Sequence, residues 1–163
     1  MVQNLAGLLR GKDVFVEGVG FLGRTGDIEL PKVKFKQTEV NGRNHDTGLL
    51  EPLEAQLEIL EFNPVIWQAV QKRINELATF VIKASVISNS KETAIYCEIG
   101  GWVSQDEGAF NNVGDKAGIK LTIDVQTYTL EIDGAQAYKI DIPNYICVIG
   151  GADKYATLRS HIQ

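Results

Sequence analysis

The chain has 163 residues, with 16 Lys and Arg against 21 Asp and Glu, which gives a formal net charge of −5. This length indicates a single domain that spans residues 1–163 and can bury a core without disulfides or metals. The acidic balance argues against a protein that holds nucleic acid by its phosphates, because such binding needs a basic surface. Sixteen glycines and only four prolines favour many tight turns and therefore a mainly β fold.

Cysteine usage and the N-terminus bear on the compartment. Cys97 and Cys147 lie in apolar runs, and we predict that both are buried free thiols. Residues 1–10 lack the basic segment and long apolar stretch of a signal peptide. No run approaches the roughly 20 apolar residues of a membrane span. We therefore expect a protein that is made and kept in a cytosol, or leaves it without a signal peptide.

In the first third of the chain, two strands flank a polar segment. Residues 13–17 are predicted to form a strand, and the glycine-rich residues 18–26 to form turns. Over residues 32–37, Val33, Phe35 and Gln37 alternate with three lysines, which predicts a half-buried strand with a cationic outer face. Residues 40–52 are predicted to be a long exposed hairpin loop, and the alternation over residues 55–60 predicts another strand.

The next segment contains the one predicted helix. Asn63 can cap it, and Pro64 suits its first position. The apolar spacing continues as far as Leu77. Period-two alternation then returns over residues 80–86 and 95–99.

The last third of the chain is also predicted to be strands. Alternation resumes over residues 119–125, but the apolar phase then shifts to Tyr128, Leu130 and Ile132. Such a shift indicates a bulge or a strand that serves two layers. Asp133-Gly134 predicts a tight turn, and residues 104–118 a second long polar loop. The whole chain is thus expected to hold about eight strands, one helix and two long loops.

A glycine motif at residues 18–23 matches the G-x-G-x-x-G pattern of dinucleotide-binding sites, and Glu39 lies near the place of the ribose-binding acid. That site needs a helix after the glycines, with its N-terminus facing the pyrophosphate. Here Gly26 and Pro31 interrupt any helix. We therefore interpret these glycines as turn residues and predict no cofactor site.

Catalytic and metal motifs are equally weak. Asp46-Thr47-Gly48 matches an aspartic protease triplet, but it lies in a polar segment without the apolar strand that such a site requires. An Asx-type turn is the simpler interpretation. His45 and His161 have no partners at metal-ligand spacing. Four acidic residues, Glu51, Glu54, Glu58 and Glu61, are interpreted as a solvated face. The sequence therefore predicts no catalytic residue and no metal ligand.

One exposed feature does not suit a simple monomer. The polar segment 40–52 ends in apolar residues, namely Leu49, Leu50, Pro52 and Leu53. Apolar residues at the foot of a long polar loop are often an interaction surface.

Several segments together resemble a known family. Val14-Phe15-Val16-Glu17-Gly18, Gly23 and residues 28–33 resemble the opening of the major tail tube proteins of contractile-tailed phages, the phage P2 tail tube family. Residues 132–134, 140–144 and 149–153 resemble that family's closing strands and tail, in the same order. The resemblance covers nearly the whole chain.

The resemblance implies a β-sandwich or barrel tail-tube fold with one flanking α-helix and two long loops. It also implies hexameric rings whose inner strands join into one β-barrel, and stacking of these rings into a tube inside a contractile sheath. The implied partners are further copies of the chain, the sheath, tape measure and baseplate proteins, and DNA that passes without specific binding. Tail-like bacteriocins and type VI secretion use the same tube fold. The implied location is a virion tail or an extracellular tail-like particle, assembled in the host bacterial cytoplasm.

Two hypotheses about sites follow from the resemblance. The polar segment and its foot are expected to make contacts between rings, through Val40, Asn41, Arg43, His45, Asp46, Leu49, Leu50 and Leu53. Residues that could face the lumen are Lys34, Lys36, Glu54, Gln56 and Glu58, and an acidic lumen would let DNA slide. The competing class is a small ligand-binding or enzymatic β-barrel with an apolar pocket.

Overall fold

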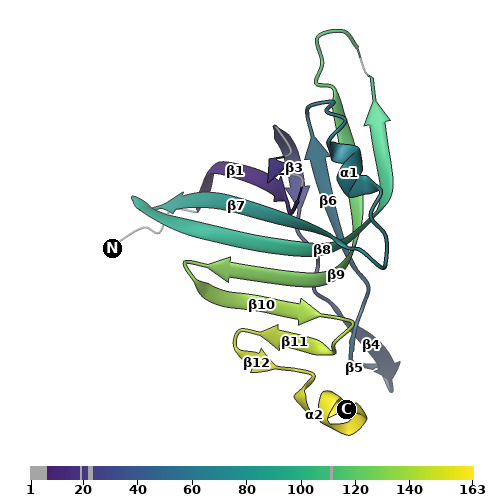
Figure 1. The fold of residues 1–163 in the computed structure, drawn as a ribbon. Coiled ribbons are helices and arrows are strands. Elements are labelled where there is room, and N and C mark those ends of the chain that lie inside the picture. Colours follow the sequence, from purple (N-terminus) through teal and green to yellow (C-terminus); the bar gives the residue numbers. More distant parts are fainter. Residues whose placement is uncertain (1–6, 19, 22–23, 111) are drawn as a thin grey trace.

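The computed structural model describes residues 7–18, 20–21, 24–110 and 112–163, which form a mainly β structure with two short helices (Figure 1). In chain order the elements are β1 (Leu8–Val16), β2 (Gly20–Phe21), β3 (Thr25–Glu29), β4 (Phe35–Val40), β5 (Arg43–Leu50), β6 (Leu53–Ile59), α1 (Ile66–Val70), β7 (Ala78–Ser88), β8 (Lys91–Ala109), β9 (Gly118–Ile132), β10 (Ala135–Asp141), β11 (Ile146–Ile149), β12 (Ala152–Asp153) and α2 (Ala156–Ile162).

The main sheet has two halves that share strands β8 and β9. The long half has the order β12-β11-β10-β9-β8-β7-β1-β2. The short half consists of β3, β6, the first part of β9 and the last part of β8. All pairings among the described strands are antiparallel, and the strands of the short half cross those of the long half (Figure 1). The mainly β prediction is confirmed, although the sheet is open and does not close into a barrel.

Strands β8 and β9 can serve both halves because they bend together at two glycines. A Cβ on Gly100 would lie 2.2 Å from Oγ1 of Thr127, and one on Gly101 would lie 2.0 Å from the carbonyl oxygen of Asp124. Gly100 pairs with Thr127 whereas Gly101 pairs with Val125, so β9 carries one extra residue at the bend. This bulge reverses the buried face of β9 and accounts for the phase shift in the sequence.

The hydrophobic core lies between the two halves. Buried side chains alternate along β6 and the first part of β9, and they meet buried side chains of β1, β7 and β8. Leu57, Ile59, Phe80, Ile99 and Leu121 are all fully buried. Both cysteines are buried and free, as predicted. Burial raises the pKa of the Cys97 thiol to about 12, because a thiolate is costly in an apolar environment.

Helix α1 is shorter than the sequence predicts. Asn63 accepts a hydrogen bond from the backbone N–H of Val65 (3.1 Å) in the turn before the helix, whose N-cap is Val65 rather than Asn63. The helix ends at Val70 rather than at Leu77. The guanidinium of Arg73 donates to the carbonyl of Val70 (2.5 Å) and satisfies an acceptor that a longer helix would use itself. The prediction of one helix is also wrong, since α2 follows Tyr155 near the C-terminus.

The first predicted long loop is largely strand, and the second is strand mainly in its first part. Residues 40–52 contain most of a hairpin, in which β4 and β5 join at Asn41 and Gly42 with positive φ values of 52° and 74°. This left-handed pair makes the tight turn that suits a hairpin. In the second segment β8 continues to Ala109. The side chains of these strand segments are exposed on both faces, so the sequence lacks the apolar alternation that predicts a strand. Gln37, predicted as half-buried, is exposed.

Candidate functional site

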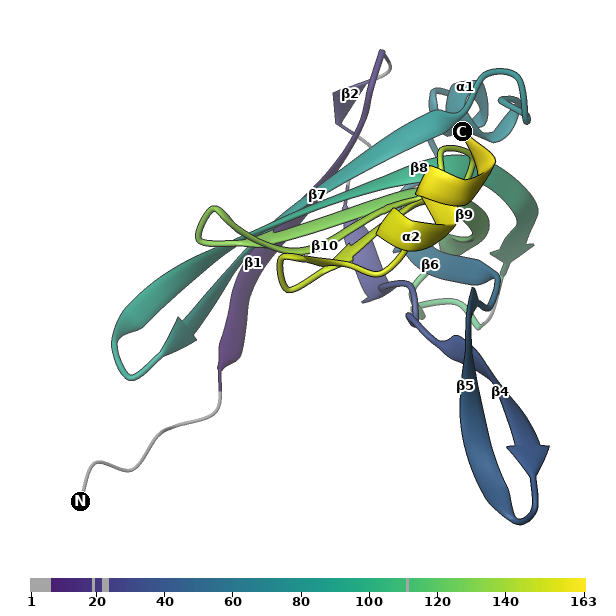
Figure 2. The same ribbon diagram turned by 90° about the horizontal axis from the view of Figure 1, so that it is seen from below.

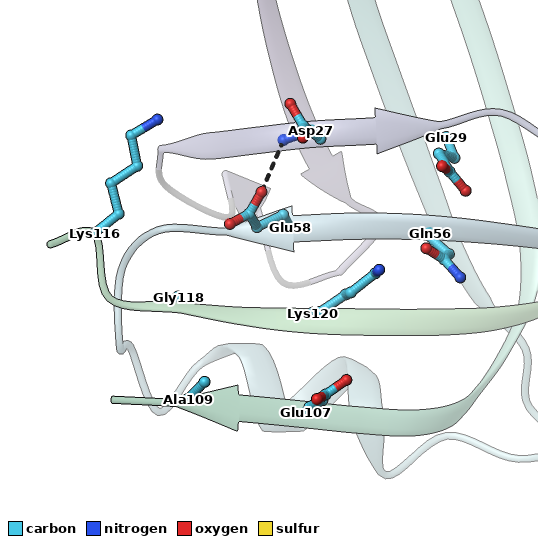
Figure 3. Close-up of a pocket in the computed structure, with 9 residues that line it drawn as sticks. All are labelled: Asp27, Glu29, Gln56, Glu58, Glu107, Ala109, Lys116, Gly118 and Lys120. Atoms are coloured by element: carbon cyan, nitrogen blue, oxygen red, sulfur yellow. Dashed lines mark hydrogen bonds between the residues drawn. The ribbon is translucent and has the colours of Figure 1, made fainter. Parts of the chain in front are cut away.

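A polar face covers the side of the short half that points away from the core. Along β6 the side chains of Glu54, Gln56 and Glu58 alternate with buried residues. Their partners on β9 are Asp124, Thr122 and Lys120. Figure 3 shows part of this face as a shallow pocket across four neighbouring strands. The pocket has a volume of about 360 Å³ and is lined by Asp27, Glu29, Gln56, Glu58, Glu107, Ala109, Lys116, Gly118 and Lys120.

Carboxylates outnumber lysines on this polar face. In the lining of the pocket the carboxylates are Asp27, Glu29, Glu58 and Glu107, and the lysines are Lys116 and Lys120. Near the start of β3 the backbone N–H of Asp27 donates to Oε2 of Glu58 at 3.2 Å (Figure 3). A Cβ on Gly26 would lie 2.5 Å from the same oxygen, so the glycine leaves room for this carboxylate.

The short half has an open strand edge on each side. On one side β3 pairs with β6 alone, and on the other side residues 102–109 of β8 pair with β9 alone among the described strands. Because each neighbour in the series β3, β6, β9 and β8 is antiparallel, β3 and β8 run in opposite directions. The β3 edge of one copy can therefore pair with the β8 edge of another in the antiparallel manner of the whole sheet.

The hairpin β4–β5, here called the arm, projects from the rest of the molecule (Figure 2). The pairs Thr38–His45 and Val40–Arg43 share one face, whereas Gln37–Asp46 and Glu39–Asn44 share the other. Arm residues 36–49 are all exposed. One face thus carries a guanidinium and an imidazole, and the other carries two carboxylates.

The base of the arm is fastened to the C-terminal region. The backbone N–H of Leu50 donates to the hydroxyl of Tyr155 at 3.0 Å, and that of Glu51 donates to the carbonyl of Lys34 at 2.8 Å. The ring of Tyr155 is buried. Sequence reasoning missed Tyr155, because no local pattern links it to a strand that lies 105 positions earlier in the chain.

The predicted contact residues fall into three groups. Exposed positions on the arm hold Val40, Asn41, Arg43, His45, Asp46 and Leu49. Leu50 is half-buried at the base. Leu53 is only 3% exposed, since it belongs to the core and pairs with Val125. It therefore does not belong to the exposed surface on which its prediction was based.

The predicted lumen residues do not all share one surface. Glu54, Gln56 and Glu58 lie together on the polar face. Lys34 lies beside Glu54 and Gln56 in an adjoining depression, and its Nζ lies 3.7 Å from a carboxylate oxygen of Glu51. Lys36 is separate, because it lies on the arm.

The motifs that resemble chemistry have structural roles where they are described. Gly18 and Gly20 have positive φ values of 79° and 98°, and a strand rather than a helix follows. Residues 19, 22 and 23 of that motif lie outside the described part. The Asp46 side chain accepts a hydrogen bond from the backbone N–H of Gly48 at 2.8 Å, which is the predicted Asx turn. Within the described ranges no cluster of His, Cys, Asp or Glu could hold a metal ion.

Neither described helix has the length and apolar character needed to cross a bilayer.

The fold matches that of a known structure. A solved structure described as the crystal structure of Hcp protein aligns with a TM-score of 0.52 and 9% sequence identity. The alignment covers 81% of this chain and 96% of that one. At this identity the likeness shows the fold alone. No curated protein sequence matches this chain.

The family model of phage tail tube protein FII matches residues 7–162. The chain therefore belongs to the phage tail tube protein FII family. It is a structural subunit of a phage tail tube and a component of the virion tail. Membership of a structural family favours this function over a ligand-binding or enzymatic barrel.

Proposed function

We propose that six copies of the chain form a ring in which the β3 edge of each subunit pairs with the β8 edge of the next. The observation that supports this most directly is the pair of open edges on the short half, which run in opposite directions. Pairing them continues the antiparallel sheet and leaves neither edge of the short half unpaired in the closed ring. The interface is heterologous, and a sixfold rotation closes it.

We further propose that the polar face of the short half lines the lumen of the tube. The other face of the short half is buried in the core, so only the polar face is free to contact water in a closed barrel. Carboxylates predominate on it, and six copies at −5 each carry a formal charge of −30 per ring. Such a lumen repels phosphates, so DNA slides through without being held.

The arm is proposed to connect successive rings. It projects away from the short half (Figure 2), and its two faces carry opposite charges. Stacking through the arms would give a hollow tube, assembled in the host bacterial cytoplasm. In a contractile tail the sheath, tape measure and baseplate proteins are the proposed partners. The same tube would serve for DNA passage in a phage or for envelope puncture in a headless particle.

Proline substitutions on the β8 edge test the ring. Along an edge strand, successive backbone N–H groups point alternately toward the paired strand β9 and away from it, toward the next subunit. Of the two variants Asp106→Pro and Glu107→Pro, one therefore removes an N–H that points to β9 and the other removes an N–H that points away from it. We expect the purified unaltered chain to form rings or tubes of uniform width by negative-stain microscopy. The variant that lacks the outward N–H should keep its monomer fold by circular dichroism but form no rings. If the unaltered chain stays monomeric at high concentration, the proposal is contradicted.

A further inference from the structure

An apolar groove lies where β3 approaches the long half. It has a volume of about 180 Å³, and its walls come from β1, β3, β7, β8 and the residue that follows β3. The lining includes Leu9, Lys12, Ile28, Leu30, Ala84 and Ile95. Leu9 is 56% exposed and Leu30 is 38% exposed. A dry cavity of about 150 Å³ can hold a benzene molecule, so this groove suits one aromatic side chain.

Helix α1 presents an aromatic side chain that its own subunit buries only in part. Ile66, Ala69 and Val70 face the core, whereas Trp67 on the other side of the helix is 41% exposed. The helix packs against β8, whose last part forms an open edge of the short half. A large exposed aromatic side chain beside an open strand edge is typical of an interface anchor.

The proposed ring brings the groove and this helix together. Ile28 pairs with the buried Leu57, so the groove flanks the β3 edge on the core side of the sheet. Helix α1 flanks the β8 edge on the same side, because its buried residues belong to the same core. When β3 of one subunit pairs with β8 of the next, both features lie along one seam, on the side opposite the polar face.

On the side of the seam where α1 lies, one charge of each sign is present, whereas the polar side carries Asp27 and Glu29 on β3 and Glu107 on β8. Lys12 is the charged residue of the groove lining. On β8, Asp106 pairs with the buried Leu121, which places it on the side where α1 lies, and it is exposed.

We propose that the groove beside β3 receives the α1 segment of the neighbouring subunit, with Trp67 as the side chain that fills it. This inference rests on the proposed ring. It adds a second, apolar contact behind the strand pairing. Two strand edges can pair by their backbones in more than one register. A side chain that must enter one groove selects a single register and a single angle between neighbouring subunits.

Fluorescence of Trp67 tests the contact. The chain has two tryptophans, so Trp102→Phe leaves Trp67 as the sole indole. We expect its emission to shift to shorter wavelength on assembly, and acrylamide quenching to fall to that of a buried indole. Tubes in which Trp67 remains as quenchable as in the monomer would overturn the inference and leave the proposed ring intact. Absence of any rings from the unaltered chain would overturn both.

A double-mutant cycle provides a second measurement with Trp102 in place. We expect Leu30→Ala and Trp67→Ala each to raise the concentration needed for assembly, Trp67→Ala by about 30-fold as for an interface anchor. If the two side chains touch across the seam, the double variant will cost less than the product of the single effects. Leu158→Ala on α2 is the matched control, because Leu158 is also 38% exposed. Independent effects, or an equal effect of the control, would overturn the inference.

Discussion

The short half of the sheet and the arm differ in how their strands are stabilised. In the short half one face is buried, so β6 and the first part of β9 are held by fully buried side chains such as Leu57 and Leu121. The arm has no buried face, and residues 36–49 are exposed. An isolated two-stranded hairpin is at best marginally stable in water. The short half therefore exposes only its edges and its polar face, whereas the arm exposes both of its faces.

This difference separates folding from assembly. Changes in the short half should unfold the subunit, whereas changes in the arm should leave the subunit folded and affect its association. The following predictions test that separation, beginning with the largest expected effect.

Deletion of residues 41–48 removes the tip of the arm. We expect tubes to be lost entirely while rings or folded monomers remain, because the deleted residues contribute nothing to the core. Electron microscopy measures the tubes, and the melting temperature should change little. Normal tubes from the deletion variant would show that the arm does not connect rings.

A pair of leucine substitutions compares the two regions within the folded subunit. Leu57→Ala in the short half should lower the free energy of unfolding by about 2–5 kcal/mol, because the side chain is fully buried. Leu49→Ala on the arm, where the side chain is 53% exposed, should change it by less than about 0.5 kcal/mol. Chemical denaturation of both variants measures the difference, and equal effects would contradict the proposed separation.

Tyr155→Phe tests the attachment of the arm. The substitution removes the hydroxyl that accepts a hydrogen bond from the N–H of Leu50. We expect a loss of about 1 kcal/mol in the free energy of unfolding, and faster hydrogen exchange at the base of the arm. Tyr145→Phe is a suitable control, because Tyr145 is 44% exposed. If exchange at Leu50 does not change, the hydroxyl does not fasten the arm.

The smallest effect concerns the C-terminal helix. The pKa of Asp153 lies below its usual value, chiefly because the guanidinium of Arg159 donates a hydrogen bond to it at 2.6 Å. A lowered folded pKa contributes stability above the ordinary pKa of Asp, near 3.9, which is lost as the pH falls through the folded value. Asp153→Asn should therefore weaken α2 at neutral pH and remove this acid dependence. Hydrogen exchange of α2 between pH 6 and pH 3 measures it, and an unchanged acid dependence would assign the effect to another group.

Much of the strand content was predictable because it depends on local alternation. The phase shift between residues 119–125 and Tyr128 correctly indicated a strand that serves two layers. The turn at Asp133-Gly134 was also predicted, and both residues have positive φ. The predicted helix α1 is too long, because the apolar spacing continues past Val70, where the helix ends. The strand predicted over residues 32–37 covers only the first part of β4, and β5 falls in the predicted loop, since neither strand has a buried face.

The candidate surfaces were only partly predictable. Glu54, Gln56 and Glu58 share one face, as their spacing in a strand requires. Their relation to Asp27 and Glu107 could not be inferred, because those strands pair across long separations in sequence. The burial of Leu53 was missed for a similar reason, since its partner Val125 is far along the chain.

The sequence by itself determined the mainly β class, the two buried thiols and the family, because these depend on composition, local period and the order of short segments. Only the tertiary structure decided which strands share an edge, which face is polar and where the groove meets β3. Those features depend on pairings between residues 25–29, 53–59 and 119–125. The free energy that selects such long-range pairings comes from the shared core, which exists only once the chain has folded.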